Sequence, residues 1–299
     1  MLNKLHKSTR GYAELMLLAV AMIWGTSYGV AKGAILFYPV AGFLFIRFIM
    51  TFVLLLPVLR NHYRQALLPG AVLGLLLLAI FLCETFGVMY TSASNAAFLI
   101  SMCVVLTPFV EWSIFRQRPE TAVFVAATLS LCGALLLTRT NDDIEMNVGD
   151  VLVLGAALLR ALMVCLTKKL MEHHDVPALA LTAVQTGVVA GGSLILLLCT
   201  QQGIPPLPTT WAFWSATLYL VLFCTMFAFF AQNYAVRRIT PTRASLLMGS
   251  EPFFGAIFAT LWLQERLSVF AWLGGGMIVA SSLWASWPRP VRRISISEP

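Results

Sequence analysis

Long apolar runs separated by short polar breaks make up most of this sequence. The runs are roughly 20 residues long, the length that an α-helix needs to cross about 30 Å of hydrocarbon. Strands of a membrane barrel would be about 10 residues long and would alternate apolar with polar positions, a pattern that this chain lacks. The sequence therefore predicts an all-α polytopic membrane protein. We expect ten transmembrane helices, at residues 12–35, 41–59, 67–90, 94–115, 121–138, 148–168, 177–200, 211–236, 241–263 and 269–287.

The second half of the chain repeats the pattern of the first half. The stretch 91–138 overlays 239–286 without a gap, at an offset of 148 residues, and each copy holds an apolar run, a charged break and a second apolar run. The other spans overlay pairwise at offsets of 136, 138 and 148. Paired positions include Trp24 with Arg160, Pro39 with Pro177, Arg47 with Gln185, Glu84 with Gln232, Ala96 with Ala244 and Leu99 with Leu247. Weak internal symmetry of this kind is typical of duplicated transporters.

Each repeated unit contains five predicted spans. Because five is odd, the second unit enters the membrane from the opposite side, so the repeats are inverted. We therefore predict two inverted five-helix repeats, residues 1–145 with spans one to five and residues 146–299 with spans six to ten and a short cytoplasmic tail. We also expect Pro108 and Pro252 to bend spans four and nine, because a proline inside a helix removes a hydrogen bond.

The distribution of Lys and Arg predicts the orientation, since cytoplasmic loops carry the excess of positive charge. With the N-terminus inside, the outer segments hold only Arg139 and Arg266, and Lys32, Arg47 and Arg160 lie within spans. The inner segments hold Lys4, Lys7, Arg10, Arg60, Arg64, Arg116, Arg118, Lys168, Lys169, Arg237, Arg238, Arg243, Arg289, Arg292 and Arg293. We therefore expect both termini in the cytoplasm and the segment 140–146 outside.

Composition supports the same class and argues against several others. The chain is 59% hydrophobic and 11% charged, whereas a soluble domain carries about 25% charged residues. Its net charge of +7 is explained by the inner loops and indicates no nucleic-acid partner. The six cysteines lie inside apolar runs without a CxxC spacing, and the four histidines lie in loops. Without a Walker loop, an HExxH motif or a plausible triad, we predict no catalytic residue, no metal site and no cofactor.

The arrangement resembles a known family. Ten spans as five plus five, an arginine in span two (Arg47), Pro108 in span four and Glu251-Pro252 in span nine are similar to the drug/metabolite transporter superfamily, EamA type, over essentially the whole chain. The resemblance implies a bacterial inner-membrane exporter of small metabolites that works by alternating access around a central cavity. Within the family the chain resembles amino-acid exporters, including aromatic amino-acid exporters. It departs from the common pattern at Gln117, where a glutamate would stand opposite Glu265.

Ionisable residues inside a span are costly, so they are usually functional or paired. Arg160 and Glu251 fall near mid-span. Either they line the cavity, with Arg160 facing a substrate carboxylate and Glu251 an ammonium group, or they form a salt bridge with each other. Arg47 and Glu84 fall in the outer third of neighbouring spans, and we expect them to pair.

Trp24 overlays Arg160 in the repeat, so both should reach the same cavity at the same depth. Aromatic and apolar walls would suit aromatic or other large apolar substrate groups. The candidate substrate-binding residues are Trp24, Tyr28, Glu84, Asn95, Phe98, Met102, Arg160, Gln232, Ser245, Met248 and Glu251.

The sequence thus favours a secondary transporter that exports neutral, including aromatic, amino acids, with membrane lipid as its surroundings. One alternative is a nucleotide-sugar or drug/metabolite transporter, although a diphosphate substrate would favour several cations in the cavity. An alternative from another class is an intramembrane lipid-modifying enzyme, which would need catalytic groups clustered at one membrane interface. The exact substrate, the coupling ion, the direction of net transport and the oligomeric state stay open.

Overall fold

The computed structural model describes residues 2–91, 96, 99–116, 119–138, 147–172, 176–201, 203–262 and 268–286. Within these ranges the regular elements are all helical. They are α1 (Leu2–Ala34), α2 (Val40–Tyr90), α4 (Cys103–Phe115), α5 (Thr121–Thr138), α6 (Val148–Met171), α7 (Ala178–Thr200), α8 (Trp211–Tyr219), the π-helical segment η1 (Leu220–Phe227), α9 (Ala228–Val236), α10 (Pro241–Met248), α11 (Glu251–Trp262) and α12 (Val269–Ser286).

Among the described residues, five stretches are long and apolar enough to cross a membrane: Gly11–Ala31 in α1, α2, α6, α7 and Trp211–Val236, which joins α8, η1 and α9. Shorter apolar helices cover Leu99–Phe115, Thr121–Leu136 and Trp272–Ser281. The protein is therefore an all-helical membrane protein in the part of the chain that the structure describes.

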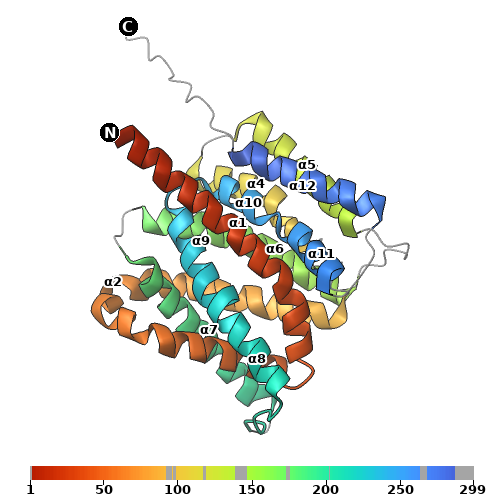
Figure 1. Cartoon of the computed structure of the whole chain (residues 1–299). Coiled ribbons are helices and arrows are strands. Elements are labelled where there is room, and N and C mark those ends of the chain that lie inside the picture. The colour runs from red at the N-terminus through yellow and green to blue at the C-terminus, as the bar shows by residue number, and fades with distance from the viewer. Residues whose placement is uncertain are drawn as a thin grey trace.

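Helix boundaries differ from the predicted spans in several places. The predicted spans two and three lie in the single element α2, because the polar residues 60–65 between them stay helical. Figure 1 shows α2 folding back on itself near these residues. The predicted span nine is divided into α10 and α11 by a turn at Gly249 and Ser250.

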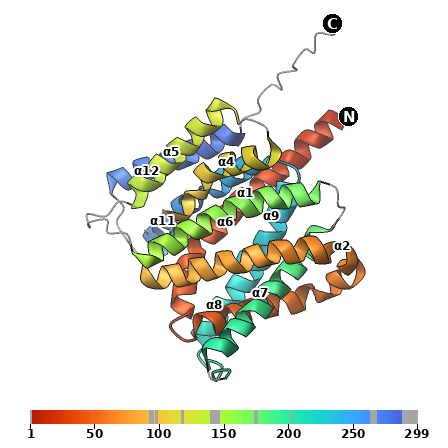
Figure 2. The same cartoon turned by 180° about the vertical axis from the view of Figure 1, so that it is seen from behind.

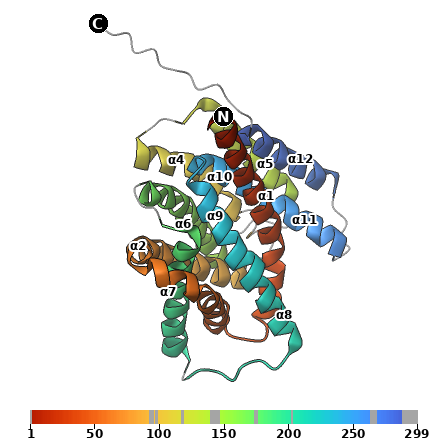
Figure 3. The same ribbon diagram turned by 60° about the vertical axis from the view of Figure 1, so that its left-hand side comes forward.

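The helices form two flanks around a central group. α2 packs against α7 on one flank and α5 packs against α12 on the other, as Figures 1 and 2 show from opposite sides. α1, α4, α6, α9, α10 and α11 lie between the flanks (Figure 3). The largest apolar core joins residues of α1, α2, α6, α7 and the α8–α9 stretch, including Leu17, Phe43, Phe48, Leu181 and Phe213.

Helices in the two halves are interrupted at positions that correspond in the repeat. The interruptions lie at Met102 and Ser250, which are 148 residues apart. The amide of each donates to the carbonyl three residues earlier, and its own carbonyl accepts from the amides three and four residues later. The bonds are Met102 N to Leu99 O (3.2 Å), Val105 N and Leu106 N to Met102 O (both 3.0 Å), Ser250 N to Leu247 O (3.3 Å), and Phe253 N and Phe254 N to Ser250 O (3.1 and 3.3 Å).

The prolines account for only one of these interruptions. Pro252 is the second residue of α11. The N–H groups of a helix's first turn have no partner within the helix, so a proline is tolerated there. The predicted break in span nine is therefore present. Pro108 lies inside α4, which continues on both sides of it. The break in the first half therefore lies six residues before the proline that was expected to cause it.

Two close contacts between helices beside the site depend on glycine. A Cβ atom on Gly25 of α1 would lie 2.6 Å from the backbone nitrogen of Gly255 and 2.7 Å from the carbonyl oxygen of Glu251. A Cβ atom on Gly249 would lie 2.4 Å from a methyl carbon of Val104. These contacts bring the backbones of α1 and α11 together and seat the turn after α10 against α4.

Candidate functional site

A central cavity of about 60 Å³ lies between residues of both halves of the chain. A space of this kind holds about one water molecule per 10–15 Å³, so it has room for a few waters. Seven predicted site residues line it: Trp24, Glu84, Arg160, Gln232, Ser245, Met248 and Glu251. That these residues bind a substrate stays a prediction, but the structure brings them together around one space.

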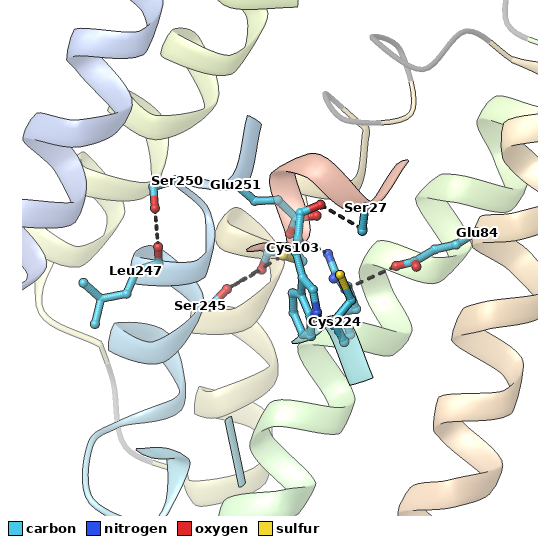
Figure 4. A network of polar contacts seen from close by, with 10 residues as sticks. Ser27, Glu84, Cys103, Cys224, Ser245, Leu247, Ser250 and Glu251 are labelled. Carbon is cyan, nitrogen blue, oxygen red and sulfur yellow. Dashed lines mark hydrogen bonds and ion pairs between the residues drawn. The ribbon is translucent and has the colours of Figure 1, made fainter. Parts of the chain in front are cut away.

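Arg160 links two carboxylates at the centre of this cavity. Its Nε atom lies 3.2 Å from Oε1 of Glu84, and its Nη1 atom lies 3.3 Å from Oε2 of Glu251. Glu84 and Glu251 approach the centre from opposite sides (Figure 4). The Arg160 guanidinium carbon also lies 4.7 Å from the centre of the Trp24 ring, within the range of a cation–π contact. Trp24 and Arg160, which overlay in the repeat, are therefore in contact.

The predicted pair of Arg47 with Glu84 is wrong, because Glu84 pairs with Arg160. Arg47 donates from Nε to the Thr225 hydroxyl at 2.8 Å. Its guanidinium carbon lies 5.4 Å from the centre of the Phe48 ring and 5.1 Å from that of Phe81. Arg47 still borders the central cavity.

The π-helical segment η1 positions two side chains of the site. The Thr225 hydroxyl accepts from Arg47 and donates to the carbonyl of Leu220, five residues earlier, at 2.8 Å. The Trp24 indole N–H donates to the carbonyl of Cys224 at 2.9 Å. Short π-helical insertions frequently occur at functional sites, and here the insertion holds the Trp24 ring and one end of Arg47.

The remaining predicted residues have different positions. Ser245 accepts from the Thr107 hydroxyl at 2.9 Å, which links α10 to α4 beside the cavity. Met102 does not line the cavity and packs against the small cluster that contains Val88 and Ala96. The break at Met102 interrupts the helical period, so its neighbours Ser101 and Cys103 line the cavity instead.

Three predicted residues cannot be placed by their side chains. Asn95 and Phe98 lie outside the described residues, and Tyr28 belongs to α1 without a described side chain. The described residues contain no group of three His, Cys, Asp or Glu side chains that could hold a metal ion.

Several lining residues were absent from the predicted set. Ser27, Phe81, Met163 and Phe229 border the cavity, and each lies three residues from Trp24, Glu84, Arg160 or Gln232, respectively. Residues three apart share a helix face. Extending these four predicted positions by one helical turn would therefore have found them.

The two ends of the cavity differ. A second cavity of about 50 Å³ shares Ser27, Arg47, Phe81 and Glu84 with the central one and extends to Ile35 and Val88, near the C-terminal ends of α1 and α2. At the other end of α1, Glu14 Oε1 lies 2.7 Å from Arg243 Nη2 of α10. Nearby, Lys168 donates to the carbonyl of Arg237 at 2.8 Å. Open space therefore continues toward one end, and an ion pair joins the helices at the other.

Comparison with known proteins identifies similar sequences. A model of the EamA-like transporter family matches the chain twice, at residues 11–139 and 147–287. An uncharacterized transporter of Archaeoglobus fulgidus is 24% identical over 284 residues, which cover 93% of this chain and 86% of that protein. The uncharacterized inner membrane transporter YedA of Escherichia coli K12 is 26% identical over 269 residues, covering 88% and 87%. A solved crystal structure is similar to this chain with a TM-score of 0.76 and 14% sequence identity. The match covers 92% of this chain and 96% of the chain in that structure. That last likeness shows the fold alone.

Proposed function

The chain belongs to the EamA-like transporter family, and on that premise we propose that it is a secondary transporter that exports amino acids or similar small metabolites across a bacterial inner membrane. The observation that carries the proposal is the central cavity, where side chains of both halves present two cations and two carboxylates. Charged groups inside a membrane protein mark substrate or ion pathways. A zwitterion offers one charge of each sign to such a site.

The proposed substrate site lies between the two halves. Trp24, Glu84, Arg160, Gln232, Ser245, Met248 and Glu251 would contact the substrate, and Tyr28, Asn95, Phe98 and Met102 stay predicted contributors. We expect Trp24, Met248 and Phe229 to face the apolar side chain of an amino acid. The partners would be an amino acid and the surrounding lipid, with no role for nucleic acid.

We propose that the architecture is ten spans in two inverted five-helix repeats, residues 1–145 and 146–299. Two separate matches of one family model support the duplication. The matched hydrogen bonds at Met102 and Ser250 support an offset of 148 residues for spans four and nine. Inverted repeats bind substrate at their interface near the bilayer midplane, where the central cavity would lie.

We propose that transport occurs by alternating access, which the unequal ends of the cavity support. The second cavity extends the open space toward Ile35 and Val88, which the predicted orientation places at the outer side. The Glu14–Arg243 ion pair closes α1 against α10 at the inner side. This arrangement favours an outward-facing conformation, and export requires the ion pair to open.

The alternative substrates can be weighed by charge. Glu84 and Glu251 both line the cavity, and their negative charges oppose a nucleotide diphosphate. A cationic drug or metabolite fits the same cavity and is the alternative that transport experiments must separate from an amino acid.

A substrate screen tests the proposal. Cells that overexpress the protein should retain less of the exported amino acid, and should tolerate toxic analogues of that amino acid better, than cells carrying the empty vector. Trp24→Ala should impair export of large apolar amino acids more than that of small ones, because the indole face is lost. Retention of every amino acid at control levels, together with export of cationic drugs, would point to the alternative.

A further inference from the structure

The two arginines of the cavity differ in what their guanidinium groups already bind. Arg160 has Glu84 and Glu251 as partners through Nε and Nη1. A substrate carboxylate at Arg160 would therefore have to displace a carboxylate of the protein. Arg47 has no such partner among the residues that the structure describes, since its only hydrogen bond there runs from Nε to Thr225.

Arg47 is held so that its terminal amino groups stay available. Thr225 fixes Nε, and the guanidinium carbon lies over the rings of Phe48 and Phe81. The residue is 5% exposed, and it lines both the central and the second cavity. A buried cation without a salt-bridge partner is costly, and the cation–π contacts and the more distant charge of Glu84 offset only part of that cost. An anionic ligand group at Nη1 and Nη2 would supply the missing partner, with the planar fork geometry that suits a carboxylate.

Acceptors without donors border the same central cavity. Oε1 of Glu251 and Oε1 of Gln232 are buried and receive no hydrogen bond within the described residues. Glu251 is 3% and Gln232 4% exposed, and both line the central cavity. A ligand that donates hydrogen bonds, such as a primary ammonium group, would satisfy them.

We propose that Arg47 binds the substrate carboxylate and that Glu251 and Gln232 bind its ammonium group, whereas Arg160 is a positioning residue that holds Glu84 and Glu251. This assignment rests on the proposed function, because it takes an amino acid as the substrate class. It differs from the expectation that Arg160 meets the carboxylate, and it gives Arg47 a specificity role in place of a helix-pairing role. The carboxylate then meets a guanidinium without a salt-bridge partner among the described residues, and the ammonium group meets oxygen atoms that receive no hydrogen bond there.

Matched ligands separate the two charges experimentally. Affinities would be measured for L-phenylalanine, phenethylamine, which lacks the carboxylate, and 3-phenylpropionate, which lacks the ammonium group. An aliphatic set of leucine, isoamylamine and 4-methylpentanoate extends the test to smaller side chains. The proteins are the purified wild type, Arg47→Gln, Arg47→Lys, Arg160→Gln and Glu251→Gln. The exposed Arg60→Gln, on the same helix as Arg47, is the control.

Wild type and the Arg60→Gln control should bind the amino acid roughly ten- to hundredfold more tightly than the amine, the factor that hydrogen bonds to a charged group provide. Arg47→Gln should lower amino-acid affinity to that of the amine and leave amine binding unchanged. Glu251→Gln should weaken the amino acid and the amine but spare the acid. If Arg47→Gln does not fold, Arg47→Lys provides the test, since it keeps the charge and loses the fork. It should then retain only part of the preference for the amino acid.

The outcomes distinguish this assignment from the proposed function. If wild type binds amino acids but Arg47→Gln and Arg47→Lys both keep the full preference over the amine, the role of Arg47 is wrong and the proposed function stands. The same conclusion follows if Arg160→Gln alone erases the preference. If wild type binds none of the amino acids in either set, the proposed substrate class fails, and the assignment of Arg47 fails with it.

Discussion

At the scale of single residues, Arg160 compensates the negative charges of two glutamates at the centre of the protein. It lies between Glu84 and Glu251, and the side chains of these glutamates are only 11% and 4% exposed, respectively. Removing one member of a buried ion pair leaves an uncompensated charge and can cost about 3–5 kcal/mol. Neutralising the partner as well removes much of that penalty.

This argument predicts the behaviour of charge variants. Arg160→Gln should lower the melting temperature of the detergent-solubilised protein, and adding Glu251→Gln should restore part of the loss. The coupling between the two changes should fall in the range of about 0.5–3 kcal/mol that contacting residues show. The exposed Lys169→Gln on the same helix serves as the control. Strictly additive effects would mean that the two groups do not interact.

Residue types in the spans indicated which side chains matter, but not which pairs they form. Seven of the predicted residues line one cavity, and for the three ionisable ones the reason is that such residues within a span almost always face the interior. The choice between Arg47 and Arg160 as the partner of Glu84 depends on how α6 packs against α2. That packing involves residues far apart in the sequence, so the offsets of the repeat could not predict it.

At the scale of helices, the crossing of α1 and α11 sets the position of Trp24 and Glu251. Gly25 allows this crossing, because a Cβ atom there would lie 2.6 Å from a backbone nitrogen, a distance at which the backbone must move. Gly29, one turn later on the same helix, has nothing within 4 Å of the equivalent point. Gly29 therefore provides a matched control for substitutions at Gly25.

We predict that Gly25→Ala destabilises the protein and impairs transport, whereas Gly29→Ala does neither. Alanine is better than glycine in a helix by about 1 kcal/mol, so Gly29→Ala should leave the melting temperature unchanged or raise it. Thermal unfolding in detergent and a transport assay provide the two measurements. Equal effects of the two substitutions would show that the close approach at Gly25 is not required.

The two helix breaks differ in whether the local sequence predicts their position. A proline at the start of a helix is favourable, so Pro252 was a sound indicator of the break in span nine. In span four the break occurs at Met102, six residues before Pro108, which lies inside α4. The break in span four lies at the position equivalent to the turn at Ser250. It therefore depends on tertiary packing that the two halves share.

At the scale of the whole molecule, the predicted orientation makes the Glu14–Arg243 ion pair an inner closure. Breaking it should admit reagents from the cytoplasmic side. Cys103, which lines the central cavity, provides a native reporter once the other five cysteines are replaced by alanine. Glu14→Gln should speed labelling of Cys103 in inside-out vesicles, while the exposed Glu172→Gln should not. Identical labelling rates in both variants would show that this pair does not close the cavity.

The orientation itself has a direct test. Single cysteines placed in the segment 140–146 should react with an impermeant thiol reagent in intact cells, whereas cysteines at either terminus should react only after the membrane is opened. The physical reason is the excess of Lys and Arg in the opposite segments. Labelling of the termini in intact cells would reverse the assignment of the inner and outer ends.

Counterflow in proteoliposomes tests the central claim that both halves share one substrate site. Vesicles containing the purified protein and an excess of unlabelled neutral amino acid should take up the labelled amino acid transiently. Arg47→Gln from the first half and Glu251→Gln from the second half should each abolish this uptake, and Arg60→Gln should preserve it. Absence of counterflow in the wild type with every neutral amino acid, or wild-type uptake in both cavity variants, would contradict the account.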